Sequence, residues 1–203
     1  EIVKCMIKKN IAVNNSNIGK NIVNLYKNNG QKIILFCHSK ACLETLFALS
    51  KDSSSFIKII QKVVLVQPPL KGAPYLGKTF NKVLDKSWPG VSCLAKDHYT
   101  KELENILIYN QSLNPFIEKN LLIIKSYKES VKDVSWILRV PYLIIKSVGY
   151  NSDGLVRYKD QSMRIERYQH MTLNLDHSDL FCSGKFSNLS TNARSGIINN
   201  ILN

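Results

Sequence analysis

The stretch KIILFCHSKA, residues 32–41, joins a strand-like run to the start of a helix through a single serine. Lys32–Cys37 is almost continuously apolar, which is typical of a parallel strand covered on both faces. Ala41–Ser50 then carries apolar side chains at the spacing of a buried helix face. Ser39 is therefore expected at a tight strand-to-helix turn, at the carboxyl end of a parallel sheet.

The same alternation of strand and helix extends to both sides of this stretch. Ile2–Ile7 and Val63–Val66 predict two more strands. Ser16–Asn28 predicts a helix that stops at Gly30, and the polar residues Asp52–Ser55 predict a loop. Strands that alternate with helices indicate an α/β fold, with a mainly parallel sheet and helices on both faces.

The second half of the chain continues this pattern less regularly. Two further strands are predicted at Tyr142–Ser147 and Gln169–Leu175, and a closing helix at Thr191–Leu202. No repeat or linker divides the chain, so residues 1–203 are interpreted as one domain. Residues 71–140 are predicted to form a lid or cap insertion over the sheet edge, with helices at Tyr99–Asn110 and Pro115–Lys128 and a turn at Trp88–Gly90.

Charge narrows the class of partner. The 203 residues include 28 Lys and Arg against 15 Asp and Glu, a formal net charge of +13. Such an excess can indicate nucleic acid or an anionic membrane surface. The basic residues are scattered, however, and no zinc-finger, RNP or helix-turn-helix signature is present. We therefore expect no nucleic-acid partner, and we interpret the charge as a solvated surface that can also favour an anionic membrane.

Hydropathy and cysteine content argue against a membrane-spanning protein and against a zinc protein. No apolar run reaches the ~20 residues needed to cross a bilayer, and no signal peptide is visible. The protein is expected to be soluble or membrane-peripheral. Its five cysteines show no paired C-x-x-C spacing and are interpreted as reduced thiols rather than zinc ligands. No metal or cofactor is predicted.

Ser39 is the first candidate for chemistry. At a strand-to-helix turn its hydroxyl would stand above the sheet, beside the backbone N–H of Lys40 and the positive end of the helix. This arrangement presents a nucleophile. A serine in this place is also a common helix N-cap, so the turn alone leaves both interpretations open.

Two later loops favour the nucleophile. Gly149–Val156 contains Asp153, and Leu175–Leu180 contains His177; each loop follows a predicted strand. Catalytic groups in open α/β sheets lie on loops beyond the carboxyl ends of the strands. A serine needs an imidazole to take its proton, and the imidazole needs a carboxylate to fix its tautomer. Ser39, His177 and Asp153 supply these three roles.

The sequence offers alternatives for two of the roles. The orienting acid could instead be Asp176, Asp179 or Asp133. A thiol nucleophile could come from Cys37 or Cys42, although neither lies at the tip of the turn. The remaining histidines, His38, His98 and His170, are interpreted as structural or surface residues.

These segments resemble the motifs of α/β-hydrolases of the bacterial lipase and esterase kind. CHSKA, residues 37–41, resembles the nucleophile elbow Gly-x-Ser-x-Gly, with Cys37 and Ala41 in place of the glycines. The likeness extends from about Ile33 to Leu180. Three further segments carry it: QPPLKGAP (67–74) resembles the family's Pro-x-x-Gly-(Ser/Thr)-Pro run, SDGLV (152–156) its acid loop, and DHSDL (176–180) its histidine loop.

The resemblance implies a serine hydrolase that cleaves carboxylic esters, chiefly lipid acyl esters, through an acyl-enzyme. Ser39 would attack the ester, His177 would carry the proton, and Asp153 would orient His177. The backbone N–H of Lys40 would contribute to the oxyanion hole. The implied partner is a lipid or other acyl-ester substrate, and no cofactor is implied.

The resemblance leaves one part of the site unaccounted for. In this family a second oxyanion donor comes from a loop well before the elbow, and nothing in residues 1–38 resembles that loop. We therefore expect a chain that lacks the first strands of the fold. Its elbow strand would have an exposed edge unless the first strand moves in to cover it. The alternative function is a catalytically impaired hydrolase-fold protein that binds lipid or a protein partner.

Overall fold

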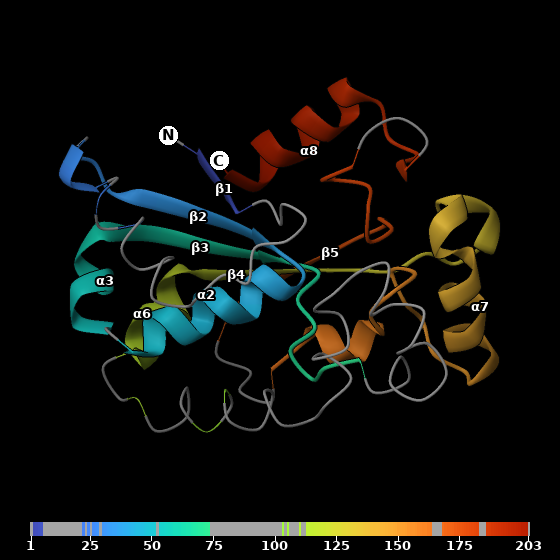
Figure 1. Ribbon diagram of the computed structural model, residues 1–203, viewed down its shortest axis with the longest axis horizontal. Helices are drawn as coiled ribbons and strands as arrows, with labels where there is room; N and C mark the ends of the chain where they lie inside the picture. Colours follow the sequence, from blue (N-terminus) through green and yellow to red (C-terminus); the bar gives the residue numbers. More distant parts are fainter. Residues whose placement is uncertain are drawn as a thin grey trace.

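A five-stranded parallel sheet forms the centre of the protein (Figure 1). The strands lie side by side in chain order, and the α/β fold predicted from the sequence is confirmed. They are β1 (Ile2–Cys5), β2 (Ile33–His38), β3 (Ile60–Val66), β4 (Leu121–Ser126) and β5 (Gln169–Leu173). The computed structural model describes residues 2–5, 22, 24, 26–28, 30–51, 53–73, 103, 105, 110, 113–163, 168–182 and 186–202.

The edge of the elbow strand β2 is covered by β1. Ile2 pairs with Ile34 and Cys5 with Cys37, in parallel register. The first strand therefore covers this edge. The sequence had left open whether the edge would be exposed or covered in this way. On its other side β2 pairs with β3, so its backbone hydrogen bonds are used in both directions.

Side chains of the central strands alternate between two apolar layers. Leu35, Val63 and Ile123 point into one layer, whereas Val64 and Ile124 point into the other, and each of the five is at most 1% exposed. Both faces of these strands are thus covered, which explains why their sequences are apolar throughout rather than alternating.

Different helices cover the two faces. Buried residues of α2 (Lys40–Lys51), α3 (Ser53–Ile59) and α6 (Asn114–Asn120) join the first layer. Ile201 of α8 (Thr191–Leu202) joins the second, and Figure 1 shows α8 on the opposite side of the sheet from α2. Helix α8 has the bounds predicted for the closing helix. The loop predicted at Asp52–Ser55 is wrong from Ser53 onward, where helix α3 begins; Asp52 lies outside the described residues. Apolar side chains spaced three residues apart, Phe56 and Ile59, bury one face of this helix.

The predicted fourth strand, Tyr142–Ser147, is wrong: it belongs to helix α7 (Arg139–Ser147), and the fourth strand is β4. The two segments are near copies, LLIIKS in β4 and YLIIKS in α7. In β4 the first four side chains are all buried. In α7, Tyr142 and Ile145 are buried while the two residues between them are exposed. A short apolar run does not distinguish strand from helix; burial on two faces or on one makes the difference here.

The insertion predicted over residues 71–140 is wrong for residues 121–126, which form strand β4. The helix expected over Pro115–Lys128 ends at Asn120, where the chain enters the sheet. Residues 121–126 therefore belong to the sheet. The turn at Trp88–Gly90 and most of Tyr99–Asn110 lie outside the described residues, so the lid formed by the rest of residues 71–140 stays a prediction.

Gly154 marks a tight contact that a substitution can test. Its φ is +101°, and an added Cβ would lie 3.0 Å from Leu138 Cβ and 3.3 Å from Val134 Cγ1. We expect Gly154→Ala to lower the free energy of unfolding by about 2–5 kcal/mol, through backbone strain and overpacking. The matched control is Gly196→Ala in α8, where no atom lies within 4 Å of an added Cβ; it should raise stability by up to ~1 kcal/mol. Equal effects in urea unfolding would contradict this account.

Candidate active site

Ser39 occupies a strained turn between β2 and α2. Its φ is 54°, in the left-handed region that non-glycine residues rarely adopt. The turn is fixed by two backbone bonds: the Ser39 N–H donates to the Val66 carbonyl (3.0 Å), and the Cys42 N–H donates to the Ser39 carbonyl (3.0 Å). The backbone thus holds a hydroxyl-bearing residue at the carboxyl end of the sheet, as the sequence predicted.

The two residues that replace the motif's glycines fit this turn. Cys37 is fully buried, with its Sγ 3.0 Å from Oγ1 of Thr45 on α2, and Ala41 is also buried. Cys42 is fully buried as well, with its Sγ 3.6 Å from the Val66 carbonyl. These thiols lie within the core rather than at the tip of the turn.

Ser39, His177 and Asp153 lie in a continuous hydrogen-bonded row. His177 Nε2 is 2.9 Å from Ser39 Oγ, and His177 Nδ1 is 2.8 Å from Asp153 Oδ2. The three residues are 7%, 6% and 0% exposed. The backbone also joins the last two, because the His177 N–H donates to the Asp153 carbonyl (2.7 Å).

The second carboxylate oxygen of Asp153 is held by its own loop. Asp153 Oδ1 accepts hydrogen bonds from the N–H groups of Leu155 (2.9 Å) and Val156 (2.7 Å). Oδ2 accepts a further bond from Gln161 Nε2 (3.3 Å) besides facing the imidazole. A buried carboxylate needs such partners, and here they also fix which oxygen faces His177.

The acid loop reaches the sheet although it follows α7 instead of a strand. Just beyond β4, the Lys128 N–H donates to the Ser152 carbonyl (2.9 Å). The Gln161 amide accepts from the Ser126 N–H (2.7 Å) and donates to the Ser126 carbonyl (3.0 Å). These bonds fasten the loop to the carboxyl end of β4, although the sequence predicted it beyond a strand at Tyr142–Ser147.

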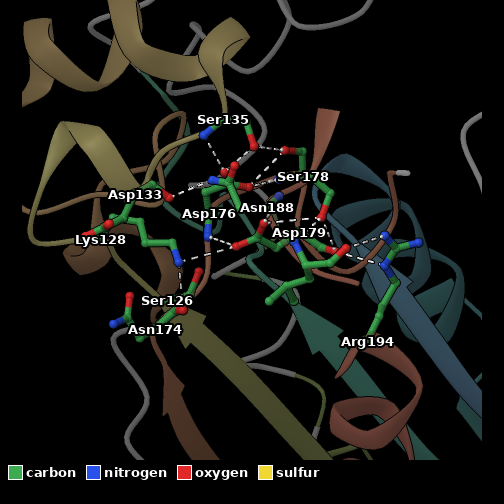
Figure 2. A network of polar contacts seen from close by, with 12 residues as sticks. Ser126, Lys128, Asp133, Ser135, Asn174, Asp176, Ser178, Asp179, Asn188 and Arg194 are labelled. Carbon is green, nitrogen blue, oxygen red and sulfur yellow. Dashed lines mark hydrogen bonds and ion pairs between the residues drawn. The ribbon is translucent and has the colours of Figure 1, made fainter. Parts of the chain in front are cut away.

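The neighbouring acid Asp176 belongs to a different polar network (Figure 2). Its Oδ2 accepts from both the N–H (2.7 Å) and the hydroxyl of Ser135, and its Oδ1 accepts from the N–H (2.9 Å) and hydroxyl (2.8 Å) of Ser178. Asp176 thus ties the histidine loop to the chain that precedes α7. Both of its carboxylate oxygens accept hydrogen bonds from these two serines, and the Asp176 side chain is fully buried.

Asp179 completes the network, and Asp133 lies at its rim. Asp179 Oδ2 accepts from the Asp176 N–H (2.9 Å) and lies 3.5 Å from Lys128 Nζ, while Oδ1 accepts from the Asn188 N–H (3.1 Å). Asp133 is exposed and contributes its backbone carbonyl to Asn188. Of the four candidate acids, Asp153 is the one whose carboxylate contacts His177.

Gln67 and His38 link the strand ends to the histidine loop through contacts that the sequence did not indicate. Gln67 is fully buried with a φ of 51°, and its Nε2 donates to Ser126 Oγ (2.5 Å) and to the Asp176 carbonyl (2.8 Å). Its Oε1 lies 3.1 Å from His38 Nε2 and accepts from it. One amide thus links the ends of β2 and β4 to the histidine loop.

His38 packs directly against the candidate base. Its ring centroid is 4.7 Å from that of His177 and 4.2 Å from that of Phe181, on which it stacks. Burial first, and the neighbouring His177 second, lower the pKa of His38 well below its usual range. The interpretation of His38 as structural fits these contacts. Of the other two histidines, His170 lies exposed on β5, and His98 is outside the described residues.

Lys40, the predicted oxyanion residue, is the first residue of α2. Backbone N–H groups at this end of a helix have no partner in the preceding turn, so they are suited to bind developing negative charge. The side chain points along the helix and lies 3.5 Å from Glu44. Any role in an oxyanion hole therefore rests on the backbone N–H.

Two further properties concern only the part of the chain that the structure describes. There, no group of three or more His, Cys, Asp and Glu side chains is placed to hold a metal ion. Within the same residues, no helix is both long and apolar enough to cross a membrane.

The lowered pKa of His38 predicts a change of stability with pH. The unfolded chain, in which this pKa is near 6.5, takes up the proton more readily than the folded chain. Stability should therefore fall as the pH drops below about 6.5, and level off below the folded-state pKa. We expect His38→Gln to lose less unfolding free energy than the wild type between about pH 7.5 and 5, measured by urea unfolding. Parallel losses would show that His38 does not titrate differently on folding.

Comparison with known proteins identifies the fold of the chain. No protein-family model and no curated protein matches the sequence. Among solved structures, the mature lipase BlEst2 of Bacillus licheniformis superposes with a TM-score of 0.68 at 16% identity, over 93% of this chain and 72% of that one. The metagenomic carboxyl esterase MGS0156 gives a TM-score of 0.70 at 22% identity, over 94% and 60%.

A phospholipase shares the fold more distantly. PlaB of Legionella pneumophila gives a TM-score of 0.57 at 13% identity, over 91% of this chain and 44% of PlaB. The chain thus spans under two thirds of both MGS0156 and PlaB. Together with the parallel sheet, these matches show that the chain has the α/β-hydrolase-like fold of bacterial lipases and esterases.

Proposed function

We propose that the protein is a serine hydrolase that cleaves carboxylic esters through an acyl-enzyme, with Ser39 as nucleophile. The observation that carries the proposal is the row from Ser39 Oγ through His177 to Asp153, with contacts of 2.9 Å and 2.8 Å. Such a row lets the imidazole accept the serine proton while the carboxylate stabilises the resulting cation.

The reaction would proceed in two halves. Ser39 Oγ attacks the ester carbonyl as its proton passes to His177 Nε2, and the negative oxygen is stabilised by the Lys40 N–H. His177 returns the proton to the leaving alcohol, which leaves an acyl-enzyme. A water molecule then attacks the acyl carbonyl, again giving a proton to His177, and the acid is released when Ser39 regains its proton.

Lipid acyl esters are the substrate class we favour. The fold is shared with proteins described as a lipase, a carboxyl esterase and a phospholipase. At 13–22% identity these likenesses concern the fold, so the substrate comes from analogy. The lid predicted within residues 71–140 would supply an acyl pocket.

The second candidate is an impaired hydrolase-fold protein that binds lipid or a protein partner. It is favoured by the elbow sequence, in which Cys37 and Ala41 stand in place of the motif's glycines. The first candidate nevertheless agrees better with a serine and a histidine already within hydrogen-bond distance.

Labelling with a fluorophosphonate probe separates these candidates. We expect the wild-type chain to be labelled, because the probe reacts with a serine that a neighbouring imidazole activates. Ser39→Ala should abolish labelling. The matched control is Ser147→Ala, an exposed serine of α7 that bonds to the Ile144 carbonyl; it should be labelled like the wild type. A folded wild-type chain that stays unlabelled would favour the impaired protein.

Substituting the acids one at a time tests the role of Asp153. Asp153→Asn should lower turnover of a soluble acyl ester by roughly 10⁴, since an amide stabilises the wrong imidazole tautomer. Asp176→Asn should chiefly lower the free energy of unfolding, by about 2–4 kcal/mol, because its amide would face N–H donors. Exposed Asp133→Asn should leave both quantities unchanged. Loss of turnover in Asp133→Asn equal to that in Asp153→Asn would refute the assignment.

A further inference from the structure

An apolar face lies open to solvent on the segment that precedes the acid loop. The segment comprises a short 3-10 turn, Trp136–Leu138, followed by α7. Its large apolar side chains are exposed on one side at helical spacing, and this set is called the α7 outer face. The members are Trp136 (56% exposed), Val140 (57%), Leu143 (52%), Ile144 (36%) and Val148 (60%).

The opposite side of the same segment is firmly anchored. Leu138, Tyr142 and Ile145 are at most 3% exposed. The Tyr142 hydroxyl donates to the Glu129 carbonyl (2.8 Å) and lies 3.1 Å from the Lys128 carbonyl. A helix that is apolar on nearly every side is normally covered on every side. Within the described residues only the inner side is covered, and the exposed α7 outer face is available for an interaction.

We propose that the α7 outer face docks onto an anionic lipid bilayer. From Val134 to Ser152 the sequence contains two charged residues, Arg139 and Lys146, and both are exposed cations. Arg and Lys beside an apolar helix face can bind lipid headgroups while their stems lie along the apolar surface. Trp136, which packs near Phe186 with ring centroids 6.4 Å apart, is the kind of side chain enriched at the membrane–water boundary.

The charges favour a bilayer over a second copy of the chain. A two-fold contact through this face would place the Arg139 and Lys146 side chains of both copies, four cations, in or beside one interface. The whole chain also carries a formal charge of +13, which opposes self-association. An anionic surface instead attracts both the segment and the rest of the protein.

Docking at this face would bring the candidate site to the membrane. Ser135, directly before the segment, holds Asp176 beside His177. After α7, the Tyr150 N–H donates to the Ile145 carbonyl (3.2 Å), and the chain runs on to Asp153. Figure 1 shows α7 at the end of the molecule toward which the strands point. Docking itself does not depend on the proposed hydrolysis.

Vesicle sedimentation with Ser39→Ala protein tests the proposal without consuming lipid. We expect binding to phosphatidylcholine vesicles that contain phosphatidylglycerol, and much weaker binding to phosphatidylcholine alone. Trp136→Ser/Val140→Ser/Leu143→Ser should lower the partition coefficient about tenfold or more. Arg139→Gln/Lys146→Gln should lower it by about fivefold per charge removed. The matched control is Met171→Ser on β5, a residue 39% exposed, which should bind like the parent protein.

A fluorescence measurement keeps the test independent of the triple variant's folding. The sequence has two tryptophans, so Trp88→Phe leaves Trp136 as the reporter. Its emission should shift to the blue on adding phosphatidylglycerol vesicles, and brominated lipid should quench it. Absence of vesicle binding, an unchanged Trp136 spectrum, or a folded triple variant that binds like the parent would overturn the proposal. So would concentration-dependent dimerisation that the triple variant abolishes, because that result assigns the face to a second copy.

Discussion

The full burial of the Asp153 carboxylate is the constraint on which the arrangement of the candidate site depends. A charge removed from water must be surrounded by donors, and here they are two N–H groups of the acid loop, the Gln161 amide and the imidazole of His177. Gln161 in turn bonds to the backbone at the end of β4. Satisfying one carboxylate therefore fixes the acid loop against the sheet and orients the imidazole toward Ser39.

A second layer of polar contacts holds the histidine loop from the other side. Asp176 and Asp179 connect it to Ser135, to Lys128 and to the segment before α8, as Figure 2 shows. Buried networks of this kind stabilise one arrangement when every member has its partners. Ser39 thus faces an imidazole whose position is determined by two buried clusters, so the proposed proton transfer would need little reorganisation.

The features that were predictable from the sequence are those with a local signal. Residues 32–41 carry both the apolar run and the serine. Asp153 and His177 lie in short segments that resemble the acid loop and the histidine loop of α/β-hydrolases. The role of Gln67 had no such signal, since its positive φ and its three partners come from elements far apart in the chain. Tyr142–Ser147 was predicted as a strand because its pattern satisfies either structure, and only tertiary burial distinguishes them. Asp153 nevertheless lies 2.8 Å from His177, because the acid loop pairs with the chain just beyond β4.

The near-identity of LLIIKS in β4 and YLIIKS in α7 has a consequence for how the chain reaches this structure. Both hexapeptides have the β-branched, apolar character of a sheet strand. In pattern either hexapeptide suits the strand position beside β3 that β4 occupies, and the wrong choice would leave α7 unmade and the acid loop misplaced. Flanking residues must therefore discriminate between them: Pro141 cannot donate to a strand ladder and fits the first turn of a helix. Two near-identical hexapeptides with different native structures are a conflict between local and global preference, which is what frustration means in a folding chain.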